Sequence, residues 1–90
     1  MPKKPKILLV EDNEMNRDML SRRLARKGYD VAIATDGQRG IDMAASENSD
    51  LILMDMMLAS NMTGAEAAAK IRKQHQIPVL FVTALGDRDR

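Results

Sequence analysis

The chain has 90 residues, of which 44% are hydrophobic and 30% are charged, and its formal net charge is +1. This length allows one small domain, and the balanced charge gives no reason to expect binding to nucleic acid or to a membrane surface. The sequence has no cysteine, which excludes a disulfide framework and a thiolate metal site, and its apolar runs are too short for a signal peptide or a membrane span. We therefore expect one cytoplasmic domain over residues 1–90, with residues 1–5 as a flexible lead-in.

The first predicted elements are a strand and a helix. Residues 7–10 are uniformly apolar, as in a parallel strand that is covered on both faces. Residues 14–27 have the pattern of an amphipathic helix, which Gly28 ends because glycine readily adopts a left-handed conformation. The apolar residues at helical spacing in this segment are Met15, Met19, Leu20 and Leu24.

The middle of the chain continues the alternation of strands and helices. Residues 29–35 mix apolar residues with alanine and polar residues, which favours an edge strand. Asp36 and Gly37 indicate a turn, and a weaker helix pattern follows around Ile41. Residues 51–54 are again continuously apolar and predict a second central strand.

The third helix has the clearest start signal. Thr63 is followed three residues later by Glu66, which fits a capping box, and the Ala-rich helix is expected to run to about His75. Pro78 then begins a fourth apolar run, at the strand position where its missing N–H costs least, and this run ends at Val82.

The order β-α-β-α-β-α-β predicts the fold class. Alternating units of this kind form a parallel sheet with right-handed crossovers and helices on both faces. The edge character of the second strand favours the strand order 2-1-3-4, which is an open, doubly wound α/β sheet. Ligands in such sheets bind at the carboxyl ends of the strands, near the point where the winding reverses.

Four polar residues stand where these apolar runs end. Glu11 and Asp12 follow the first strand, Asp55 follows the third and Thr83 follows the fourth. Each has a structural alternative, because carboxylates cap helices and polar residues are common at strand ends. Two adjacent carboxylates facing a third are harder to explain in this way, since crowding without a cation raises the pKa of at least one of them. Oxygen ligands in this arrangement suit Mg²⁺.

Asp55 and Thr83 predict a second kind of chemistry at the same edge. A carboxylate held beside a cation can attack phosphorus and become an aspartyl phosphate, while the cation screens the repulsion from the anionic donor. The hydroxyl of Thr83 would then hydrogen-bond one phosphoryl oxygen. The sequence contains no glycine-rich phosphate loop.

These motifs resemble the receiver domain of two-component response regulators, which has a flavodoxin-like fold. The stretches that carry the resemblance are residues 7–13, 51–55 and 78–84. By this resemblance, Asp55 is the phosphoacceptor, phosphorylated from the phosphohistidine of a sensor histidine kinase or a histidine phosphotransfer protein, and Thr83 is the switch hydroxyl. Glu11 and Asp12 would hold Mg²⁺, and the backbone carbonyl of Met57 would complete the protein ligands.

The resemblance also implies elements beyond the last residue of this sequence. Receivers have a fifth strand, a lysine that pairs with the phosphoryl group and a last helix, so we expect about thirty further residues in the native protein. Without them, residues 79–82 would form an exposed apolar sheet edge, which predicts pairing between two copies of the chain. Ala59 stands where receivers often have proline.

A second hypothesis stays open. A pseudo-receiver would use the same fold as a docking module without phosphorylation; the intact acidic residues argue against it, and the missing lysine argues for it. A phosphatase of the haloacid dehalogenase kind is disfavoured, because Met57 stands where that family has a second aspartate. We favour a self-phosphorylating switch that turns over no external substrate. Because Met57 and Leu85 are apolar and do not orient water, we also predict a long-lived phosphoryl group.

Overall fold

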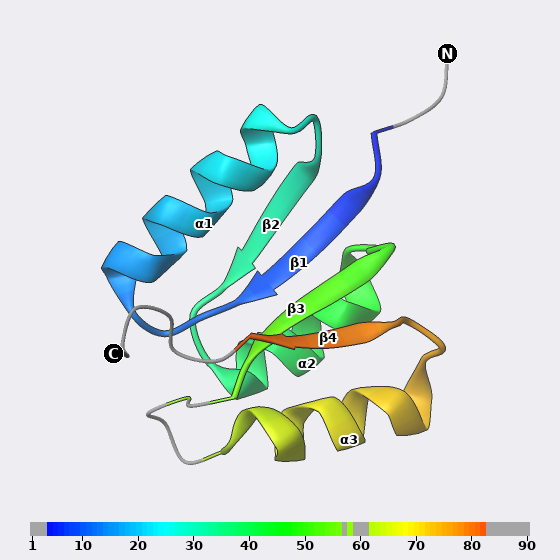
Figure 1. Cartoon of the computed structure of the whole chain (residues 1–90). Helices are drawn as coiled ribbons and strands as arrows, with labels where there is room; N and C mark the ends of the chain where they lie inside the picture. The colour runs from blue at the N-terminus through cyan, green and yellow to red at the C-terminus, as the bar shows by residue number, and fades with distance from the viewer. Residues whose placement is uncertain (1–3, 57, 59–61, 83–90) are drawn as a thin grey trace.

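The computed structural model describes residues 4–56, 58 and 62–82, and strands and helices alternate along this part of the chain (Figure 1). The strands are β1 (Lys6–Val10), β2 (Asp30–Ala34), β3 (Leu51–Asp55) and β4 (Val79–Val82). The helices are α1 (Glu14–Arg26), α2 (Gly37–Ser46) and α3 (Gly64–Gln74).

The strands form one parallel sheet in the order β2-β1-β3-β4, which confirms the predicted topology. Val10 of β1 pairs with Met54 of β3, and Asp55 at the end of β3 pairs with Val82 of β4. Since the strands are parallel and in register, their carboxyl ends lie at one edge of the sheet. That edge carries the acidic residues singled out in the sequence.

Helices cover both faces of the sheet, with α1 on one side and α2 and α3 on the other (Figure 1). Side chains alternate between the faces along each strand, so the uniformly apolar strands serve two cores. Leu8 and Val10 face the larger core with Ile71 of α3. Ile7 and Leu9 face the smaller core, against which Leu24 of α1 packs.

The apolar spacing in α1 overstates how much of that helix is covered. Leu20 and Leu24 pack against the smaller core, but Met15 is 81% exposed and Met19 is 42% exposed. No residue of α1 is buried. The helix contacts the sheet mainly beside β2, at its edge, so only the stripe that contains the two leucines reaches apolar neighbours.

Local signals set the helix boundaries. Gly28 has φ of 97° just after α1, and the capping box of Thr63 and Glu66 is formed at the start of α3, as predicted. Asp36 is the N-cap of α2, and its carboxylate accepts the Arg39 N–H at 2.8 Å. The predicted turn at Asp36 and Gly37 is therefore the beginning of the helix.

Within the described residues, β4 lies at one edge of the sheet, and Leu80 is 57% exposed. Pairing of two copies through residues 79–82 stays a prediction. In the same part of the chain, no helix combines the length and the apolar character that crossing a membrane requires.

Candidate functional site

Three carboxylates meet at the carboxyl ends of β1 and β3. Glu11 and Asp12 leave β1 directly after Val10, and Asp55 is the last residue of the neighbouring strand β3. Each of the three offers a carboxylate oxygen, and these oxygens all lie within 4.8 Å of one another. The structure thus brings together all three acidic residues that the sequence predicted for this site.

The site is shielded from solvent. Glu11 is 4% exposed and Asp55 is 6% exposed, while Asp12 is half-buried. Burial raises the pKa of Glu11 to about 7, because taking a carboxylate out of water disfavours its charged form. The N–H of Asn13 acts against this shift by donating a hydrogen bond, whereas the hydrogen bond and charge of Asp55 and the charge of Asp12 raise the pKa further.

The loop between β1 and α1 is held by hydrogen bonds on both sides of the acidic pair. The N–H of Glu11 donates to the carbonyl of Ala34 at the end of β2, at 3.1 Å. Asn13 donates its N–H to Glu11 Oε2 at 3.2 Å, and its own side chain caps α1 by accepting the Asn16 N–H at 2.9 Å. The short loop therefore fixes where Glu11 and Asp12 emerge.

Arg17 of α1 also contacts this loop. Its Nη1 donates to the carbonyl of Glu11 at 3.3 Å and to the carbonyl of Asp12 at 3.0 Å. These two bonds inside the chain were not predicted from the sequence. The available signal was its position four residues after the N-cap, from which a side chain reaches back over the first turn.

Gly64 supports Asp55 from the other side. A Cβ at Gly64 would contact the carbonyl oxygen of Asp55, and it would lie 2.9 Å from the Asp55 carbonyl carbon and 3.0 Å from Cα of Met56. Only glycine lets the start of α3 approach the end of β3 this closely. The capping box predicted at Thr63 and Glu66 gave no indication of this contact.

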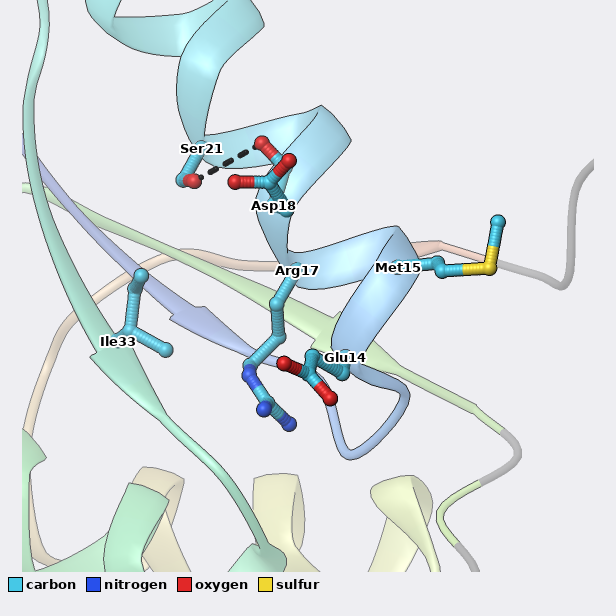
Figure 2. A pocket seen from close by; sticks show the side chains of 6 residues that line it. All are labelled: Glu14, Met15, Arg17, Asp18, Ser21 and Ile33. Atoms are coloured by element: carbon cyan, nitrogen blue, oxygen red, sulfur yellow. Dashed lines mark hydrogen bonds between the residues drawn. The ribbon is translucent and has the colours of Figure 1, made fainter.

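A hollow of about 380 Å³ lies beside the first turns of α1, lined by Met15, Arg17 and Ile33 together with three polar residues (Figure 2). None of the three clustered carboxylates lines it. We therefore place the candidate site at the carboxylates, where the chemistry of the donors is specific, and not at this open hollow.

Two further predicted site residues, Met57 and Thr83, lie outside the described residues. Thr83 directly follows Val82, which pairs with Asp55 across β3 and β4. The roles predicted for the Met57 carbonyl and the Thr83 hydroxyl stay predictions.

The sequence matches the response regulator receiver domain family over residues 7–90. The chain belongs to this family. The receiver is 38% identical over 81 residues to response regulator ArlR of Staphylococcus haemolyticus and 36% identical over 83 residues to transcriptional regulatory protein AfsQ1 of Streptomyces coelicolor. These matches cover 90% and 92% of this chain but only 36% of each relative, so the chain spans just over a third of the length of these relatives.

Solved receiver structures share the fold. The receiver domain of the sensor histidine kinase PA1611 from Pseudomonas aeruginosa PAO1, solved with a magnesium ion coordinated in its active-site cleft, is 32% identical with a TM-score of 0.85, over 96% of this chain and 72% of that chain. A CheY-like receiver domain protein from Methanospirillum hungatei JF-1 is 29% identical with the same TM-score, over 90% of this chain and 65% of that chain. The predicted family and the predicted flavodoxin-like fold are confirmed.

Proposed function

We propose that this receiver, acting as one unit over residues 1–90, is the phosphoacceptor switch of a two-component phosphorelay. Asp55 would accept a phosphoryl group from the phosphohistidine of a sensor histidine kinase or a histidine phosphotransfer protein. The observation that carries the proposal is that three carboxylates at the carboxyl ends of β1 and β3 have oxygens within 4.8 Å of one another, in a chain of the receiver family. A switch of this kind turns over no external substrate.

The donor set fits Mg²⁺ as the cofactor. Glu11, Asp12 and Asp55 offer only carboxylate oxygens, the hard ligands that Mg²⁺ prefers. The raised pKa of Glu11 supports this fit, because burial disfavours a full set of negative charges that a divalent cation would stabilise. When bound, the cation would supply positive charge that offsets the repulsion between these carboxylates and a phosphoryl group. We assign the remaining protein ligand to the backbone carbonyl of Met57.

Asp55 is the nucleophile that the arrangement supports best, because it ends a central strand and is held against Gly64. One Asp55 oxygen would form a bond to phosphorus while the bond between phosphorus and the histidine nitrogen breaks. The electron pair of that bond stays on the imidazole, which takes up a proton. In dephosphorylation, water would attack the same phosphorus and Asp55 would leave as a carboxylate.

Thr83 would convert phosphorylation into a conformational change. Its place in the sequence directly after Val82, the residue that pairs with Asp55, supports a role for its hydroxyl as a donor to a phosphoryl oxygen. Movement of this residue toward the phosphoryl group would be the step that a downstream partner senses.

Intact mass measurement tests the proposal. The purified chain is incubated with acetyl phosphate, with Mg²⁺ or with a chelator, beside the variant Asp55→Asn. The matched control is Asp50→Asn, which makes the same change at the residue directly before β3, at the other end of this strand from Asp55. We expect a gain of one phosphoryl group that requires Mg²⁺, is absent in Asp55→Asn and is kept in Asp50→Asn. No gain in the unmodified chain would overturn the proposal and favour a docking module of the same fold.

A further inference from the structure

We propose that Arg17 is a positioning residue that holds the acidic loop between β1 and α1 in its metal-binding geometry. The half-buried Arg17 donates from Nη1 to two successive carbonyl oxygens, at 3.3 Å to Glu11 and at 3.0 Å to Asp12. Hydrogen bonds from a charged donor are stronger than those from a neutral one. Arg17 thus binds the main chain of the two residues that supply two of the three clustered carboxylates.

The sequence explains why Arg17 reaches this loop. Asn13 is the N-cap of α1, so Arg17 is the fourth residue of the helix. Side chains on a helix tilt toward its N-terminus, and a long side chain at this position covers the first turn and the loop before it. Figure 2 shows Arg17 extending from α1 with its guanidinium at the N-terminal end of the helix.

The two bonds hold the main chain on both sides of the Asp12 Cα. The carbonyls of Glu11 and Asp12 belong to the peptide planes on either side of the Asp12 Cα, and both planes are bonded to the same guanidinium. Holding both planes restricts both backbone dihedrals of Asp12, and these dihedrals set the direction of the Cα–Cβ bond from which its carboxylate extends. Two further hydrogen bonds hold the same loop through the amides of Glu11 and Asn13.

Positioning and charge predict opposite effects on metal affinity. A cation near the site repels Mg²⁺, so if Arg17 acted only through its charge, removing it would tighten metal binding. If Arg17 positions the loop, removing it weakens metal binding even though a repulsive charge is lost. Lysine separates the two explanations further, because it keeps the charge and replaces the guanidinium, whose Nη1 makes both bonds, with a compact ammonium.

The experiment compares Arg17→Lys and Arg17→Ala with the control Arg26→Ala, which removes the same charge from the exposed far end of α1. Mg²⁺ affinity is measured by calorimetry, and the exchange rate of the Asn13 amide is measured by NMR in a chelator. We expect both Arg17 variants to bind Mg²⁺ about tenfold more weakly, as is typical for loss of a group that orients metal ligands. Both Arg17 variants should also speed hydrogen exchange at the Asn13 amide. The exchange rates of the α3 amides should stay unchanged, and Arg26→Ala should match the unmodified chain in both measurements.

The expected effect on Mg²⁺ binding rests on the proposed function. The exchange measurement distinguishes a failure of the proposed function from a failure of this inference. If the unmodified chain binds no Mg²⁺ while exchange at Asn13 still responds to Arg17, the proposed function fails and the positioning of the loop stands. If exchange at Asn13 is unchanged in both variants, Arg17 does not position the loop. Tighter Mg²⁺ binding in Arg17→Ala with unchanged binding in Arg17→Lys would also overturn the inference, because charge alone would then explain the residue.

Discussion

The contact between Gly64 and Asp55 makes the substitution Gly64→Ala a sharp test of how the site is built. The added Cβ would contact the Asp55 carbonyl oxygen and lie 2.9 Å from the Asp55 carbonyl carbon, and these are main-chain atoms that cannot rotate away. Overpacking of this kind costs about 1–3 kcal/mol, whereas replacing glycine by alanine in a helix regains at most about 1 kcal/mol. We expect a net loss of about 2 kcal/mol, which is the upper end of the overpacking cost less the gain in helix propensity.

Thermal unfolding followed by circular dichroism measures this loss. For a domain of this size, a change of about 2 kcal/mol lowers the midpoint by roughly 10 °C. Gly37→Ala is the matched control, because Gly37 is the first residue of α2 as Gly64 is of α3, and both are buried. At Gly37 the nearest atom to a new Cβ would be the Met62 sulfur at 3.3 Å, in a flexible side chain that can yield.

We expect Gly37→Ala to melt within about 3 °C of the unmodified chain, since its cost stays near 0.5 kcal/mol. Gly64→Ala should also weaken Mg²⁺ binding, because opening the contact displaces Asp55. Equal melting temperatures for the two variants would refute the argument, since they would show that the end of β3 moves aside at little cost.

Three further predictions concern acid titration, helix capping and the phosphoryl group. The pKa of Glu11 is raised from 4.5 to about 7 in the metal-free folded protein. Between these two pH values the folded protein holds a proton that the unfolded chain has lost. The free energy of unfolding should therefore fall as pH rises from 4.5 to 7. Urea unfolding at a series of pH values, in a chelator, should show this fall in the unmodified chain and a smaller fall in Glu11→Gln. An equal dependence on pH in the two proteins would contradict the prediction. Thr63→Ala removes the hydroxyl that accepts the Glu66 N–H at 3.1 Å and should lower the free energy of unfolding by about 1 kcal/mol. Thr63→Ser should keep most of this stabilisation, because serine retains the hydroxyl. Because Met57 and Leu85 are apolar, the phosphoryl group should persist for minutes at neutral pH after acetyl phosphate is removed; loss within seconds, followed by intact mass, would exclude this.

Local sequence signals predicted much of this fold correctly. The uniformly apolar runs that became β1 and β3 are buried on both faces, and the capping box at Thr63 begins α3 as expected. The predicted strand order also followed from the sequence, since the second run is less apolar and lies at an edge. These features depend on neighbours a few residues away or on the two-residue repeat of a strand, which the sequence displays directly.

Other features depend on which elements meet in space. Four apolar residues at helical spacing predicted one covered face of α1, yet Met15 is 81% exposed because the helix lies beside the edge strand β2. Spacing alone does not say how much sheet lies under a helix.

The acidic site combines both kinds of information. Parallel strands end at one edge, so the sequence by itself determined that Glu11, Asp12 and Asp55 belong to a common site. Only the tertiary structure decided how they are held, because Gly64 approaches the main chain of Asp55 and the Arg17 side chain donates to two main-chain carbonyls. Such contacts depend on the path of the main chain, which the residue types alone do not specify.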